Sequence, residues 1–128
     1  MRFMVLVKTD GASEEDASPS AEALAEMGRY NDELIKAGVL LAGEGLLPSA
    51  NGARVKFTGG EPTVIDGPFT EAKELVAGFW LLDVKSKEEA VEWVKRVPCT
   101  EGAESHIEIR QVFEPGDFTA SATAEARE

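Results

Sequence analysis

The chain is poor in the residue types that disulfides, zinc sites and nucleic-acid surfaces require. Its 128 residues include one cysteine and one histidine, and 13 Lys and Arg stand against 24 Asp and Glu, which gives a net charge of −11. The single Cys99 excludes an internal disulfide and is typical of a reducing compartment. One histidine and one cysteine make no zinc ligand cluster. The acidic balance argues against a nucleic-acid partner, because phosphate binding depends on Lys and Arg.

Long apolar runs and nucleotide-binding motifs are also missing. No stretch approaches the roughly 20 apolar residues of a membrane span, and the N-terminus shows no signal peptide. No glycine-rich loop follows a strand and opens a helix, so we expect no cofactor. These absences predict a protein of a reducing compartment that binds neither membranes nor nucleic acid, and the length predicts one folded domain.

Residues 1–114 carry the patterns of an α+β domain. The segments 2–8 and 76–84 are apolar on both faces, which predicts two strands covered on both sides. Ser18 and Ser86 are expected to cap two helices. The other expected elements are helices from 19 to 37 and from 87 to 97, and strands at 39–42, 53–57, 62–65 and 105–113. The first of these helices carries an apolar stripe at helical spacing, made of Leu24, Met27, Leu34 and Ile35. The tail 115–128 has little to bury, so we expect it to be loosely ordered.

This order of elements predicts a ferredoxin-like fold, in which a βαβ unit occurs twice and a β-hairpin is inserted between the two units. The two helices would cover one face of a four-stranded sheet. We expect Trp80 and Leu82 on the uncovered face, where they would form an apolar patch that is rare on a monomer. We therefore expect a homodimer in which two sheets pack face to face as a dimeric α+β barrel.

The last strand is expected to present a charged pair to the space between the two sheets. If Ile107, Ile109 and Phe113 pack under the helices, strand alternation puts Glu108 and Arg110 on the opposite face. These two residues form either a structural ion pair or a ligand site in which Arg110 holds an anionic group.

The most specific local pattern is the stretch from Val64 to Glu74. Asp66 and Gly67 are turn residues, and Pro68 fixes a sharp corner that is followed by the lone aromatic Phe69. Asp66 either caps this turn through its own backbone or acts as a general base or ligand carboxylate in a pocket lined by Phe69. Lys73 belongs either to a surface turn or to a substrate clamp.

Two other residues are candidates for the same site. Glu44 lies between Gly43 and Gly45, at the expected mouth of the sheet, and is either a second catalytic carboxylate or a solvated loop residue. Trp80 is either a packing residue or a stacking platform for a small molecule. A magnesium site made of Asp66 and Glu44 alone stays open, although nothing in the sequence favours it.

Several short motifs occur along residues 1–114 in the order of a known family. They are Met1-Arg2-Phe3-Met4, Ala37-Gly38-Val39, Gly43-Glu44-Gly45-Leu46, Asp66-Gly67-Pro68-Phe69-Thr70-Glu71-Ala72-Lys73-Glu74, Gly78-Phe79-Trp80 and Glu108-Ile109-Arg110. Together they resemble the YCII-related family and, within it, the branch named for its Asp-Gly-Pro-Phe (DGPF) motif. The resemblance implies a dimeric ferredoxin-like barrel that is cytoplasmic, bacterial, largely uncharacterised and often encoded near an alternative sigma factor.

The resemblance does not carry over a catalytic pair. Shorter family members have a histidine in the first helix and an aspartate after the second, and the matching positions here are Met27 and Val97. Two hypotheses therefore stay open. The chain is either a cofactor-free enzyme, in which Asp66 or Glu44 moves a proton and Arg110 holds an anionic substrate, or a non-catalytic ligand-binding or regulatory dimer acting with a sigma factor.

Overall fold

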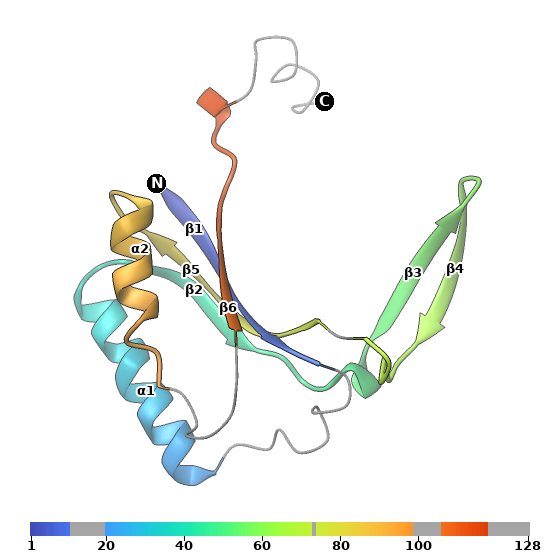
Figure 1. Cartoon of the computed structure of the whole chain (residues 1–128), viewed down its shortest axis with the longest axis horizontal. Helices are drawn as coiled ribbons and strands as arrows, with labels where there is room; N and C mark the ends of the chain where they lie inside the picture. Colours follow the sequence, from blue (N-terminus) through green and yellow to red (C-terminus); the bar gives the residue numbers. More distant parts are fainter. Residues whose placement is uncertain (11–19, 73, 99–105, 118–128) are drawn as a thin grey trace.

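The computed structural model describes residues 1–10, 20–72, 74–98 and 106–117 (Figure 1). Lys73, Cys99, the expected cap Ser18 and the tail beyond Asp117 lie outside these described residues. The elements in chain order are β1 (Arg2–Thr9), α1 (Ala21–Lys36), β2 (Leu40–Gly45), the 3₁₀ turn η2 (Ser49–Asn51), β3 (Ala53–Thr58), β4 (Glu61–Asp66), β5 (Leu75–Asp83), α2 (Lys87–Val94), β6 (His106–Gln111) and the 3₁₀ turn η3 (Pro115–Asp117).

Four strands form an antiparallel sheet in the order β2-β5-β1-β6, and β3 pairs with β4 in a separate two-stranded sheet. Both helices lie on one side of the four-stranded sheet (Figure 1). This arrangement is α+β and compatible with the expected ferredoxin-like fold. The two central strands, β1 and β5, are the two segments whose sequences are apolar on both faces.

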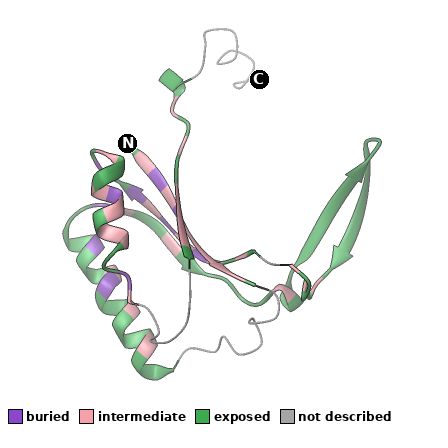
Figure 2. Ribbon diagram, viewed as in Figure 1, coloured by how far each residue is buried: buried purple, intermediate pink, exposed green. Residues whose placement is uncertain are grey.

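The helices cover the sheet because each begins at a side-chain cap and presents an apolar stripe. Ser20 accepts a hydrogen bond from the Ala23 N–H at the start of α1, and Ser86 accepts one from the Glu89 N–H at the start of α2. The core contains buried side chains from β1, β5 and both helices (Figure 2). Its members include Phe3, Val5, Tyr30, Leu34, Trp80, Leu82 and Ala90.

Trp80 and Leu82 lie on the helix side of the sheet, so the expectation that they form the uncovered face is wrong. The Trp80 side chain packs against α1, where its ring meets the Tyr30 ring edge-on at 5.5 Å and its indole N–H donates to Asn31 Oδ1 at 2.8 Å. Because side chains alternate along a strand, Phe79 and Leu81 occupy the opposite face.

Three other apolar residues expected to be covered are exposed. Phe113 follows the end of β6 at Gln111 and is 71% exposed, so it does not pack under the helices with Ile107 and Ile109. On α1, Leu24 and Ile35 point to solvent, and the stripe that reaches the sheet is formed by Tyr30 and Leu34 with Met27 beside them. The buried stripe is therefore narrower than the sequence pattern indicated.

The β3–β4 sheet, which we call the ribbon (residues 53–66), projects from the rest of the molecule (Figure 1). It comes between β2 and β5 in the chain and rises from the end of the large sheet, on the side away from the helices (Figure 1). Every residue of its two strands is exposed (Figure 2).

Candidate functional site

We call the side of the large sheet that faces away from the helices the open face. Its centre is apolar: Met4 and Leu6 of β1 lie opposite Leu81 and Phe79 of β5. These four side chains are only partly buried by the described residues. The open face is thus a patch of half-exposed apolar groups in the middle of the sheet, where a polar surface is usual for a monomer.

Charged side chains border this patch on both edge strands. Glu44 of β2 lies opposite Phe79, and Glu108 of β6 lies opposite Leu6, so one row across the sheet begins and ends with a carboxylate. At a strand spacing of about 4.8 Å, their backbones are separated by roughly 14 Å. Arg110 lies in the next row, opposite Met4, which confirms that Glu108 and Arg110 share the face away from Ile107 and Ile109.

Glu108 and Arg110 form an ion pair. Arg110 Nη1 lies 3.1 Å from Glu108 Oε2, and the Arg110 side chain is mostly exposed. Ion pairs in contact with water contribute little to stability. Arg110 is therefore accessible to a ligand despite the ion pair. That Arg110 holds an anionic group stays a prediction.

The Asp66–Phe69 corner is fixed at the base of the ribbon by the turn η2. The Gly67 N–H donates to the Gly52 carbonyl at 2.9 Å, and the Phe69 N–H donates to Ser49 Oγ at 2.9 Å. A β-carbon on residue 67 would overlap the Ser49 carbonyl oxygen, so only glycine fits there. The Gly67–Pro68 peptide bond is cis.

These contacts remove the amides that Asp66 would need in order to cap its own turn. The Gly67 and Phe69 N–H groups bond to Gly52 and Ser49, and Pro68 has no N–H. The exposed Asp66 carboxylate makes no hydrogen bond or ion pair within the described part of the chain. The turn-cap interpretation does not hold here, which leaves the carboxylate available to other groups.

Phe69 lies half-buried beside Asp66 and is covered by a cation. The Arg54 guanidinium carbon lies 3.9 Å from the centre of the Phe69 ring, which is the geometry of a cation–π contact. Arg54 was not a candidate from the sequence, because its contact with Phe69 joins two segments whose proximity depends on the fold. The corner therefore combines an aromatic ring and a guanidinium with a carboxylate that no described residue bonds.

The candidate residues predicted from the sequence lie in three separate places in the structure. Glu44, Glu108 and Arg110 share the open face, whereas Asp66 and Phe69 belong to the corner. Trp80 lies on the helix side, separated from the other candidates by the sheet. Glycine flanks Glu44 because Trp80 packs on β2: a β-carbon on residue 43 would lie 2.8 Å from Trp80 Cδ1. Lys73 lies outside the described residues.

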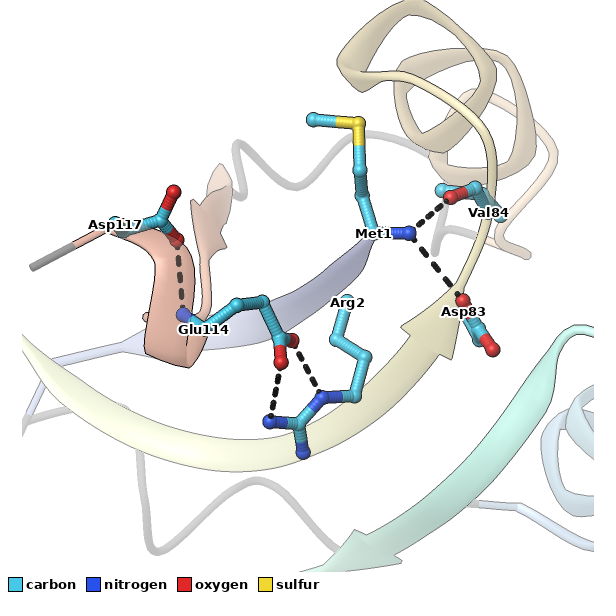
Figure 3. Close-up of polar contacts among 6 residues, drawn as sticks. All are labelled: Met1, Arg2, Asp83, Val84, Glu114 and Asp117. Carbon is cyan, nitrogen blue, oxygen red and sulfur yellow. Dashed lines mark hydrogen bonds and ion pairs between the residues drawn. The ribbon is translucent and has the colours of Figure 1, made fainter.

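A polar cluster joins the start of β1 to the segment after β6 (Figure 3). Arg2 Nε donates to Glu114 Oε1 at 2.7 Å, and this carboxylate raises the pKa of Arg2. The Glu114 N–H donates to Asp117 Oδ2 at 2.8 Å, and the terminal amine of Met1 donates to the Val84 carbonyl at 2.9 Å. A cavity of about 170 Å³ lined by Gln111, Val112, Phe113 and Asp117 lies next to this cluster and contains none of the candidate residues.

The described ranges also contain no metal-binding cluster and no membrane-spanning helix. Within them, no group of three or more His, Cys, Asp or Glu side chains is arranged to hold a metal ion. None of the helices there has the length and apolar character needed to cross a membrane.

Comparison with known proteins identifies the family. The model of the YCII-related domain matches residues 1–115. The chain belongs to the YCII-related family. A relative of this YCII-related chain is an uncharacterised protein of Rhizobium meliloti (strain 1021), which is 30% identical over 109 residues, covering 84% of this chain and 85% of the relative.

Proposed function

We propose that this YCII-related chain, of the DGPF branch, is one subunit of a homodimer whose open faces pack together and that binds a small organic anion at the rim of the interface. The observation that carries this proposal is the half-exposed apolar patch of Met4, Leu6, Phe79 and Leu81 at the centre of the sheet. Complete burial of a side chain of this size stabilises by about 1.5–3 kcal/mol, so eight of them in a dimer supply a substantial driving force.

The chemistry at the rim supports a ligand site. Glu44 and Arg110 stand at the edges of the apolar patch, and each is exposed in the single subunit. A second sheet about 10 Å away would partly enclose them. The guanidinium of Arg110 suits an anionic group such as a carboxylate, and its partner Glu108 orients it.

The corner is the second part of the proposed site. Leu46, which directly follows β2, donates its N–H to the Ala77 carbonyl at 2.8 Å, so the end of β2 that carries Glu44 lies beside the start of β5. The corner leads into that same start of β5 after Glu74. Asp66 and Glu44 thus belong to the same end of the sheet, and the Asp66 carboxylate, which no described residue bonds, is available for a polar contact with a ligand.

Binding is better supported than catalysis. Asp66 and Glu44 are both exposed, and no hydrogen bond from the described chain orients either carboxylate as a general base requires. A cofactor-free enzyme would need the partner subunit to provide this orientation. A regulatory dimer acting in the bacterial cytoplasm with a sigma factor would use the same site.

Ligand-observed NMR with a panel of small carboxylic acids tests this proposal. We expect the NMR signals of some of these acids to broaden in the presence of the wild-type protein. With Arg110→Gln or Asp66→Asn in its place, the same signals should stay narrow. Glu26→Gln, which alters an exposed carboxylate on α1, is the matched control and should bind as the wild type does. Equal binding by all four proteins, or by none, would contradict the proposed site. New product signals on long incubation would favour the enzyme.

A further inference from the structure

The ribbon has one apolar side and one polar side. Cross-strand partners share a side, and Val55 lies opposite Val64 while Phe57 lies opposite Pro62. These four residues form what we call the apolar side of the ribbon, and the pair of Ala53 and Asp66 at the base of the ribbon lies on the same side. Arg54, Lys56 and Thr63 lie on the other side together with Ile65.

The described residues do not cover the apolar side. Phe57 is 70% exposed and Val64 is 65% exposed. The contacts described above hold the ribbon at its base, where Gly67 bonds to Gly52 and Arg54 covers Phe69. An isolated two-stranded ribbon is at best marginally stable in water, so a partner is needed to hold this one in place.

We propose that the apolar side of the ribbon packs against a second copy of this chain, as a contact additional to the open face. This inference rests on the homodimer proposed above. The ribbon rises on the side of the sheet away from the helices, which is the side of the open face (Figure 1). A second copy seated on the open face would therefore lie beside the ribbon, and the apolar side of the ribbon would extend that interface.

The limited area of the open face favours an additional contact between the two copies. Four strands about 4.8 Å apart and some 20 Å long give a sheet face of roughly 400 Å². A stable interface buries about 800 Å² of accessible surface on each partner, well above this flat footprint, so added contact area favours a stable dimer. Two six-residue strands add roughly 200 Å² on one side of the ribbon. The ribbon thus contributes a substantial part of what a stable dimer requires.

The charges of the ribbon also favour a second copy of this chain. Its 14 residues contain two cations, Arg54 and Lys56, and two carboxylates, Glu61 and Asp66, in a chain whose net charge is −11. Two copies of so acidic a chain repel each other, and the repulsion is weakest where an electrically neutral segment makes the contact. The apolar side bears no Lys or Arg, which argues against nucleic acid and an anionic membrane as the occupant.

Sedimentation equilibrium of Val64→Glu and Thr63→Glu tests the ribbon contact. Both changes add one carboxylate to β4, but Val64 lies on the apolar side and Thr63 on the other. We expect Val64→Glu to raise the dissociation constant of the dimer at least about tenfold relative to Thr63→Glu, because a charge at the contact must be desolvated. A monomeric wild type would overturn the homodimer itself. A dimeric wild type with equal effects of the two substitutions would overturn only the role of the ribbon.

Amide hydrogen exchange provides a measurement that needs no substitution in the ribbon. In the wild-type protein, we expect amides of residues 53–66 to exchange at least about tenfold more slowly above the dimer dissociation constant than well below it, because partner contact suppresses opening of the ribbon. Amides of Tyr30 and Leu34 in the core of α1 are the internal control and should change little. Equal exchange of the ribbon at both concentrations would overturn the inference.

Discussion

The indole N–H of Trp80 donates to Asn31 Oδ1 at 2.8 Å, which joins the centre of β5 to α1. This contact anchors one face of β5 beneath the helix. Since alternate residues point to opposite faces, it also assigns Phe79 and Leu81 to the open face on which the proposed dimer depends.

The contact between Trp80 and Asn31 should be measurable as a coupling energy. In a double-mutant cycle of Trp80→Phe and Asn31→Ala, followed by urea unfolding, we expect a coupling of about 1 kcal/mol, the usual contribution of such a hydrogen bond. Trp80→Phe combined with Asp32→Ala, a change at the exposed neighbour on α1, should give a coupling near zero. Equal coupling in the two cycles would contradict the contact.

The raised pKa of Tyr30 predicts that the folded protein loses stability at strongly alkaline pH. Burial raises the pKa of Tyr30 to about 12, above its ordinary value of 10, and its hydroxyl donates to the Trp93 carbonyl at 2.7 Å. Because the folded state favours the protonated phenol, this contribution is complete below pH 10 and is lost as the pH rises through 12. Tyrosinate absorbance checks the pKa directly, because the chain has one tyrosine. Tyr30→Phe should weaken the alkaline loss of stability, and a phenol that titrates near 10 would contradict this account.

Gly67→Ala should destabilise the corner, because a β-carbon at this position overlaps the Ser49 carbonyl. Relief of the overlap requires the backbone of the corner or of η2 to move, with an expected cost of about 2 kcal/mol in urea unfolding. Gly45→Ala is the control, since no atom lies within 4 Å of its added β-carbon. A loss for Gly67→Ala no greater than that for Gly45→Ala would show that the corner is not held as described.

The ion pair between Arg2 and Glu114 should contribute only slightly to stability. Both side chains are more than a third exposed despite the 2.7 Å contact, so water and salt screen the pair. Glu114→Gln should lower Tm by about 1–3 °C at low salt, and the difference should shrink in 1 M NaCl, where the Debye length is about 3 Å. Glu92→Gln, which breaks the more exposed pair with Lys95, should lower Tm less. A large salt-independent loss would instead indicate that Glu114 is needed for folding.

The sequence predicted the kinds of elements well because alternation and capping are local. Ser86 caps α2 as expected, and Ile107 and Ile109 lie on the helix side opposite Glu108 and Arg110. It could not predict which face of β5 meets the helices. Both faces of β5 are apolar, so alternation separates Trp80 from Phe79 without saying which one the helices cover.

The candidate site was less predictable, because it depends on contacts between distant parts of the chain. One of the two interpretations of Asp66 was that it caps its own turn, but Gly52 and Ser49, on the other side of the ribbon base, bond to the amides that it would use. The glycines beside Glu44 suggested close approach of the backbone to some other group, and the group that approaches residue 43 is the Trp80 ring. A pattern of residue types gives the local conformation but not the partner.

Sedimentation equilibrium at micromolar concentration tests the proposed dimer most directly. We expect the wild type to sediment as a dimer, with twice the 13.7 kDa mass of one chain, and Leu6→Glu on the open face to sediment as a folded monomer. Leu24→Glu, which replaces an exposed leucine on α1, should remain dimeric. A wild type that sediments as a monomer, or a Leu6→Glu variant as dimeric as Leu24→Glu, would contradict the pairing of the open faces.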